Sequence, residues 1–258
     1  MKNRSFLTAL IVLITFAFTQ FFSKGLIHFL LKFAGENYPK ILPQILLYLI
    51  WLGSIFIAFV ILYRLKIKQF IYELGLNRNI LEAALFTFIA TLPMMLGYFF
   101  VTKTVNFSLT TLIYLSFLPA FMEETLFRGF VFGQLFKRAR WGFIPAVLVN
   151  ALFFALGHMG QSRNAATVIG ILLLTFLGGG WFAWLYIEWD ENLWVPIGLH
   201  FFMNFWWGTF KMGENALGGG TANLFRVLTI ILTIAITVLR AKRGKGLVIN
   251  RTNLWRRS

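Results

Sequence analysis

The segment between residues 111 and 129 reads Thr111-Leu-Ile-Tyr-Leu-Ser-Phe-Leu-Pro-Ala-Phe-Met-Glu123-Glu124-Thr-Leu-Phe-Arg128-Gly129. It is apolar enough for a membrane-spanning helix, yet it carries two carboxylates and a guanidinium. Each charge at bilayer depth costs about 2.5 kcal/mol or more. Glu124 and Arg128 lie four residues apart, so on a helix they share a face and can pair. Glu123 points about 100° away, which leaves its carboxylate without this partner.

The whole chain has the composition of an integral membrane protein. Of its 258 residues, 59% are hydrophobic and 13% are charged, against about 45–50% and about 25% in soluble domains. Cysteine is absent, which excludes disulfides and Cys-ligated metal sites. We assign the net charge of +15 to cytoplasmic loops and tails that face anionic lipid, and not to nucleic acid binding.

Eight stretches are long and apolar enough for transmembrane helices, which need about 20 residues. They lie near residues 6–23, 41–63, 81–101, 108–136, 142–158, 165–187, 192–210 and 222–240. None alternates with a period of two, so the sequence predicts an all-α, polytopic helical bundle and not a β-barrel. The first stretch shows no small-x-small cleavage site, which favours a retained helix over a removed signal peptide.

Most of the 24 Lys and Arg residues cluster at the N-terminus, after the second span, after the fourth span and in the C-terminal tail. With eight helices these segments share one side, so the positive-inside rule places both termini in the cytoplasm. We expect three parts: N-terminal helices over 1–105, a core over 106–212, and a last span with a basic tail over 213–258. The glycine runs at 178–180 and 218–220 are expected to be flexible points or close helix contacts, and in a membrane small residues more often mark close contacts.

Two further segments place polar groups inside predicted spans. Asn150, Phe154 and His158 recur every four residues, and His200 and Asn204 are also four apart, so each set shares a helical face. A buried glutamate can act as a general base toward water. Imidazoles can bind a divalent metal or, like an amide, hydrogen-bond an oxyanion. A glutamate, two histidines and an asparagine from three helices are therefore the parts of a hydrolytic site.

The ordered motifs resemble those of a known family. They read Glu123-Glu124-x-x-x-Arg128, then Phe154-x-x-x-His158, then His200-x-x-x-Asn204. This order on successive membrane helices is similar to that of the CPBP family, the CAAX-protease and bacteriocin-processing intramembrane proteases related to the Rce1-type prenyl protease. The resemblance covers roughly residues 110–210 and includes every motif position.

The resemblance implies a role for each motif residue. Glu123 would activate the attacking water, and His158 would orient that water or bind a metal. His200 and Asn204 would stabilise the tetrahedral oxyanion or complete the metal site. The supporting residues would be Glu124, Arg128 and Phe154. A divalent metal such as zinc, held by His158, His200 and Glu123, and hydrolysis without a metal both stay open.

Three functions follow from these residues. The leading one is an intramembrane endopeptidase that acts on a membrane-associated protein or peptide, with membrane lipid as its other partner. A non-proteolytic scaffold or immunity protein of the same fold would have no need of Glu123. A proton-coupled transporter also uses intramembrane Glu and His, but it would show inverted repeats, which this sequence lacks. The compact size favours a bacterial plasma membrane.

Overall fold

The computed structural model describes residues 2–33, 38–39, 41–64, 66–244 and 246–256, and this part of the chain is helical without a β-strand. The elements are α1 (Lys2–Ala17), η1 (Phe18–Phe22), α2 (Ser23–Leu31), α3 (Leu42–Tyr63), α4 (Ile67–Leu74), α5 (Ile80–Thr102), η2 (Thr110–Phe117), α6 (Leu118–Glu124), η3 (Thr125–Phe132), α7 (Gly133–Lys137), α8 (Phe143–Leu156), η4 (Met159–Gln161), α9 (Ala165–Glu188), α10 (Trp194–Thr209) and α11 (Gly220–Arg243).

The predicted all-α, polytopic membrane fold is confirmed. Among the described residues, six helices are long and apolar enough to cross a membrane: Asn3–Leu31, Leu42–Tyr63, Ile80–Thr102, Phe143–Gln161, Ala165–Glu188 and Gly220–Arg243. The other two predicted spans are also helical. Residues 110–137 form one continuous helix from η2 through α7, and α10 is a shorter helix of 16 residues. The count of eight spans is therefore approximate.

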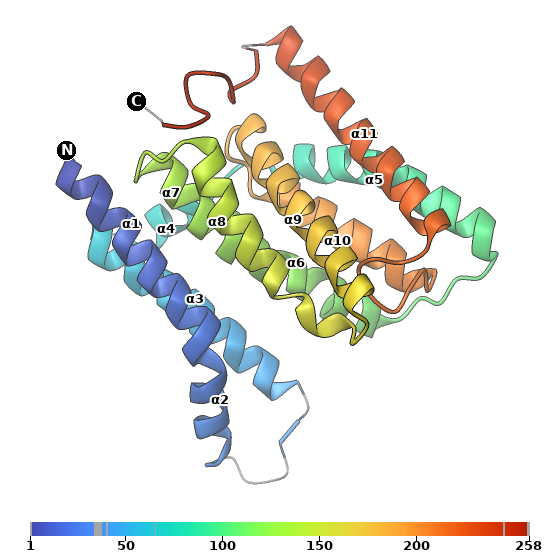
Figure 1. Ribbon diagram of the computed structural model, residues 1–258, viewed down its shortest axis with the longest axis horizontal. Helices are drawn as coiled ribbons and strands as arrows, with labels where there is room; N and C mark the ends of the chain where they lie inside the picture. Colours follow the sequence, from blue (N-terminus) through green and yellow to red (C-terminus); the bar gives the residue numbers. More distant parts are fainter. Residues whose placement is uncertain (1, 34–37, 40, 65, 245, 257–258) are drawn as a thin grey trace.

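The helix over residues 110–137 is here called the central helix. Its first part, η2, exposes Ile113, Tyr114, Leu115 and Phe117, whereas η3 is buried inside the bundle. Helix α10 packs along η2 and α6, whereas α8 packs on η3. Helix α9 covers α8, and α5 lies between α10 and α11. Figure 1 shows α1, α2 and α3 as an arm at one side of this assembly, with α5 and α11 at the other side. The central helix is thus shielded by neighbours at the level of its charged residues.

The charged part of the central helix is also its most deeply buried part. All eight residues of η3 are buried. Their aromatic rings pack edge to face, with Phe130 at 5.6 Å from Phe59 and Phe127 at 5.2 Å from Phe154. The segment η3 is a π-helix, and such turns are rare and are frequent at functional sites. Its wider turns change the direction of the side chains that follow Glu124.

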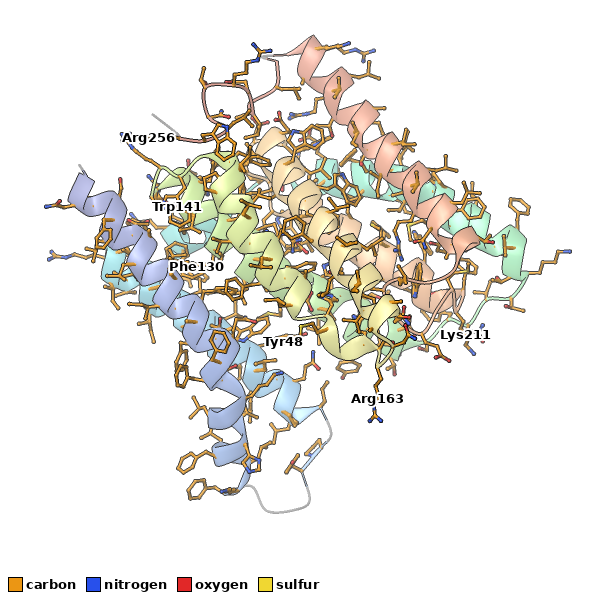
Figure 2. The ribbon with its side chains drawn as sticks, in the orientation of Figure 1. Tyr48, Phe130, Trp141, Arg163, Lys211 and Arg256 are labelled. Atoms are coloured by element: carbon orange, nitrogen blue, oxygen red, sulfur yellow. The ribbon has the colours of Figure 1, made fainter. Side chains whose placement is uncertain are left out.

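The two chain termini lie at one end of the bundle. Trp141 forms an isolated antiparallel bridge with Arg256, and both lie far from Arg163 and Lys211 in Figure 2. The Glu188 carboxylate accepts hydrogen bonds from the backbone N–H groups of Val248 and Ile249 in the C-terminal tail, at 2.9 and 3.0 Å. The tail is therefore folded onto the bundle. The basic tail residues Lys245 and Arg257 lie outside the described residues.

An ion pair between Arg138 and Glu73 lies at the same end of the bundle. The Arg138 guanidinium donates to the Glu73 carboxylate, with 3.1 Å between Nε and Oε2. This hydrogen bonding raises the pKa of Arg138 above its ordinary value. Since Glu73 belongs to α4 and Arg138 follows α7, the pair holds the short helix α4 against the end of the central helix.

The glycine runs behave differently from each other. A Cβ at Gly179 would lie 3.0 Å from the Ala151 Cβ, so this glycine allows the close contact of α8 and α9 that the sequence predicts. At Gly219 and Gly220 a Cβ would meet no atom within 4 Å. The expectation of close helix packing at this second run is wrong at these two positions, because its backbone faces open space.

Candidate active site

The first motif forms a buried ion pair. Arg128 Nη1 lies 3.0 Å from Glu124 Oε1, and both side chains are fully buried. The pairing predicted from the four-residue spacing is confirmed. Two charges that are removed from solvent are stabilised chiefly by each other and by hydrogen bonds, so the pair fixes the rotation of this helix. Glu124 Oε2 has no hydrogen-bond partner among the described residues.

His200 of α10 contacts the same carboxylate. The distance between His200 Nδ1 and Glu124 Oε1 is 2.8 Å, and 12% of the His200 side chain is exposed. An ionised carboxylate only accepts hydrogen bonds, so Nδ1 must donate, and the remaining nitrogen, Nε2, is left for reactants. The first and third motifs are thus joined through Glu124.

Phe154 of α8 connects the second motif to the other two. The Arg128 guanidinium lies over the Phe154 ring at 4.2 Å and over the Phe182 ring at 5.3 Å. The Phe154 ring is 4.8 Å from that of His158 and 6.5 Å from that of His200, measured between centroids. A desolvated cation over an aromatic face is stabilised by about 2 kcal/mol. Phe154 therefore lies between the Arg128 guanidinium and the His158 ring and also contacts the ring of His200.

His158 is held in the same manner as His200. Its Nδ1 lies 2.8 Å from the backbone carbonyl oxygen of Phe154, one helical turn earlier, and its side chain is partly exposed. A carbonyl oxygen accepts a hydrogen bond, so Nδ1 carries a proton. Nε2 of the neutral ring is then a free acceptor. In both histidines of the motifs, Nδ1 is used in a hydrogen bond within the protein and Nε2 is left for a ligand.

Glu123 differs sharply from its neighbour Glu124. Its side chain is partly exposed, and it makes no hydrogen bond or ion pair within the described part of the chain. Tyr48 of α3 and Arg128 lie within electrostatic range of its carboxylate. Glu123 is therefore the carboxylate of the motif that stays available to a water molecule.

Two further polar residues border this arrangement. Asn204, one turn beyond His200, points Nδ2 at the Leu115 carbonyl oxygen over 3.4 Å, a long hydrogen bond. Asn150, one turn before Phe154, is fully buried, and neither polar atom of its amide has a partner among the described residues. A buried amide without a partner costs about 1–3 kcal/mol, so Asn150 keeps its hydrogen-bonding capacity for another group.

The structure brings together five of the seven motif residues by direct contact: Glu124, Arg128, Phe154, His158 and His200. Glu123 and Asn204 lie on the same elements without joining that network by a hydrogen bond. Sequence reasoning missed Tyr48, which is buried and accepts a hydrogen bond from Gln44. The signal was present, because these two polar residues are four apart in an otherwise apolar span.

The donor types fit zinc, whose ligands include imidazole nitrogen and carboxylate oxygen. A ligating histidine also tends to donate its other ring N–H to a carboxylate or a carbonyl oxygen, as His158 and His200 do. Over the described ranges, however, no three His, Asp or Glu side chains gather closely enough to hold a metal ion. As placed, the three predicted ligands do not form a metal site.

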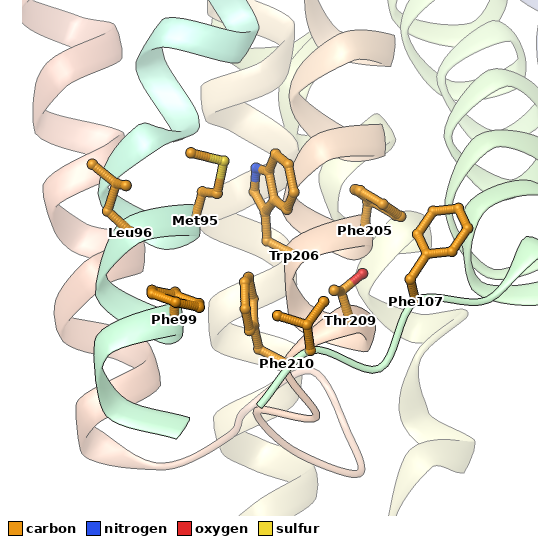
Figure 3. Close-up of a pocket in the computed structure, with 9 residues that line it drawn as sticks. Met95, Leu96, Phe99, Phe107, Phe205, Trp206, Thr209 and Phe210 are labelled. Carbon is orange, nitrogen blue, oxygen red and sulfur yellow. The ribbon is translucent and has the colours of Figure 1, made fainter. Parts of the chain in front are cut away.

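A separate apolar cavity of about 380 Å³ opens beside α10. Figure 3 shows Phe205 and Trp206 of α10, and Phe210 directly after it, facing Met95 and Phe99 of α5 across it. None of the predicted site residues lines this cavity, although it begins one residue after Asn204. It offers no ionisable group for chemistry.

Comparison with protein families identifies the segment that holds the site. A family model described as type II CAAX prenyl endopeptidase Rce1-like matches residues 104–206. The matched segment is Rce1-like. It contains all seven motif residues, so the resemblance drawn from the motifs is confirmed. No curated protein and no solved structure matches the chain. The match covers 103 of the 258 residues, less than half of the chain.

Proposed function

We propose that this protein is an intramembrane endopeptidase that hydrolyses a peptide bond in a membrane-associated protein or peptide with a glutamate-activated water. The observation that carries this proposal is the different state of two adjacent glutamates. Glu124 is buried and shared by Arg128 and His200 at 3.0 and 2.8 Å. Glu123 stays partly exposed with no ion pair within the described residues. A scaffold needs only the first of these carboxylates.

Glu123 would serve as the general base. Its carboxylate takes a proton from water as the water oxygen attacks the carbonyl carbon of the scissile peptide bond. His158 presents a free Nε2 acceptor, because its Nδ1 is committed to the Phe154 carbonyl oxygen. That nitrogen can accept the second O–H of the same water and so direct a lone pair at the carbon. Two acceptors thus orient one nucleophile.

His200 and Asn204 would stabilise the oxyanion. Attack converts the carbonyl into a tetrahedral oxyanion, which needs donors aimed at it. Asn204 supplies the N–H groups of its amide. His200 donates from Nε2 when its ring is protonated, and its Nδ1 is held by the Glu124 carboxylate at 2.8 Å. Glu124 and Arg128 are therefore positioning residues, since they act through His200.

Transfer of the proton from Glu123 to the leaving amine completes the catalytic cycle. Collapse of the tetrahedral intermediate breaks the carbon–nitrogen bond, and the leaving amine receives the proton that Glu123 took from water. The products are a carboxylic acid and an amine, which leave as a carboxylate and an ammonium group once the acid proton passes to the amine, and Glu123 returns to its ionised form. Every step uses side chains of this chain.

Cleavage in proteoliposomes tests the proposal. The full chain is reconstituted with a set of fluorogenic membrane-anchored peptides, some of them prenylated at a C-terminal CAAX sequence. The wild type should cleave at least one peptide, and Glu123→Gln should lower kcat by about 10² to 10⁴, the usual contribution of a general base. A variant that cleaves as the wild type does would refute the role of Glu123. Full complementation of a gene deletion by Glu123→Gln would instead support the scaffold function.

A further inference from the structure

Arg226 is a buried cation that the proposed site does not use. It lies in the second turn of α11, and only 8% of its surface is exposed. Nη1 is buried without a hydrogen-bond partner, and Arg226 forms no ion pair with any described carboxylate. An unpaired charge in a protein interior is costly unless a counter-charge joins it. Binding of an anion by the Arg226 guanidinium would therefore lower this cost.

The N-terminal end of α11, which precedes Arg226 in the helix, also favours an anion. Helix α11 has 24 residues and starts at Gly220, and no side chain caps it. The first N–H groups of a helix have no acceptor within the helix, and with the helix dipole they favour negative charge. The backbone there is uncrowded, because a Cβ at Gly219 or Gly220 would meet no atom within 4 Å. Gly218 has a φ of +62°, which favours glycine.

Trp207 places the glycine run and Arg226 beside each other. The Arg226 guanidinium lies over the Trp207 ring, 4.4 Å from its centroid. A Cβ on Gly218 would lie 2.2 Å from the Trp207 Cη2 atom, so this glycine packs against the edge of the same ring. Side chains on a helix lean toward its N-terminus, which turns Arg226 toward the start of α11. Thr229, one turn further, adds a buried hydroxyl without a partner.

We propose that the N-terminal end of α11 binds a phosphate group. The phosphate would rest on the open backbone at Gly219 and Gly220 and accept hydrogen bonds from the Arg226 guanidinium. A planar guanidinium fork matches phosphate oxygens in a bidentate manner, and glycine-rich turns before helices recur as phosphate sites. The site is independent of the proposed peptidase chemistry, and none of its residues belongs to the three motifs.

A phospholipid headgroup and free phosphate both offer this chemistry. The 24 residues of α11 span about 36 Å at 1.5 Å per residue, against a hydrocarbon layer of about 30 Å. The first turn of α11 thus reaches the headgroup level. The Tyr98 hydroxyl donates to the Ala222 carbonyl oxygen at 3.0 Å, which ties α5 to this first turn of α11.

Native mass spectrometry of the purified full chain tests the site. Delipidated protein is titrated with phosphatidylglycerol, phosphatidylcholine or inorganic phosphate, and thermal unfolding is followed in parallel. Arg226→Met removes the cation at nearly constant length. Arg163→Met is the matched control, since Arg163 is an exposed cation of the loop before α9, and this loop contacts the segment before α11 through the Ala216 N–H, which donates to Gln161 Oε1. Gly219→Asp places a carboxylate at the helix cap and should compete with phosphate.

One tightly retained phosphatidylglycerol is expected on the wild type and on Arg163→Met. Its affinity should fall roughly tenfold or more in Arg226→Met, the loss of one charge-assisted bond pair. Gly219→Asp should raise the unfolding temperature without lipid and abolish the lipid effect. If inorganic phosphate reproduces the effect and the lipid adds nothing, the site holds and its ligand is free phosphate. Equal retention by Arg226→Met or Gly219→Asp, or an equal loss in Arg163→Met, overturns the proposal.

Discussion

Replacing Glu124 by glutamine should unfold the site, whereas the same change at Glu123 should leave the fold intact. Glutamine keeps the size of glutamate and removes its charge. At position 124 the change takes away the counter-charge of Arg128, which is fully buried, and weakens the acceptor of His200. At position 123 it touches a partly exposed side chain without an ion pair among the described residues.

The magnitudes follow from that difference. Removing one partner of a buried ion pair costs about 3–5 kcal/mol, because the other charge stays buried. One neutral hydrogen bond from Arg128 to the new amide oxygen would survive, so we expect about 3 kcal/mol for Glu124→Gln. A partly exposed residue away from buried networks changes stability by about 0.5 kcal/mol or less, which we expect for Glu123→Gln.

The measurement is reversible unfolding in detergent micelles with increasing denaturing surfactant, combined with peptide cleavage on the folded fraction. Glu123→Gln should unfold like the wild type and lack activity. Glu124→Gln should unfold far earlier and retain a small residual activity, because its general base is intact. Equal stability of the two variants would show that the Glu124–Arg128 pair contributes nothing to the fold. Full activity of folded Glu124→Gln would refute the positioning of His200 by Glu124.

Three other changes test separate parts of the structure. We expect cleavage to persist after dialysis against a chelator such as 1,10-phenanthroline, because no three donors gather within the described chain; loss that stoichiometric Zn²⁺ restores would show a metal centre. Gly97→Ala should destabilise the bundle by about 1–3 kcal/mol through overpacking, since its Cβ would lie 2.2 Å from the Phe225 ring, whereas Gly178→Ala, with open space around it, should be neutral or stabilising in the same unfolding assay. Glu188→Ala removes the acceptor of two tail N–H groups, so trypsin should cut after Arg251 faster than in the wild type; an unchanged rate would show that the tail is held elsewhere.

Local spacing was enough to predict the pair of Glu124 and Arg128, because residues four apart on any helix meet regardless of the surroundings. It was also enough to isolate Glu123. It was not enough to choose the carboxylate that His200 contacts. That choice depends on how α10 is rotated and shifted against the central helix, and many weak side-chain contacts set those two quantities together.

The π-helical turns of η3 add a second reason. A helical wheel with 3.6 residues per turn describes α6 and α7 of the central helix and fails in η2 and η3, because each π-turn holds more residues than an α-turn. Tyr48 illustrates a third limit. Its spacing of four from Gln44 marks a polar pair within α3, but α3 and the central helix are separated by more than 40 residues of sequence, so the spacing does not show that Tyr48 lies near Glu123.

The sequence by itself determined that this chain is a helical membrane protein with an Rce1-like set of motifs, since the bilayer imposes length and hydropathy on each span separately. It also predicted that the charged triplet divides into a pair and a free carboxylate. Only the tertiary structure decided which groups the pair serves: His200 through Glu124, and both imidazoles through Phe154 beneath the Arg128 guanidinium. Among the residues that the structure describes, it also left Arg226 without a counter-charge. Contacts between helices that are distant in the sequence depend on three-dimensional packing, and the spacing of residues within one helix does not encode them.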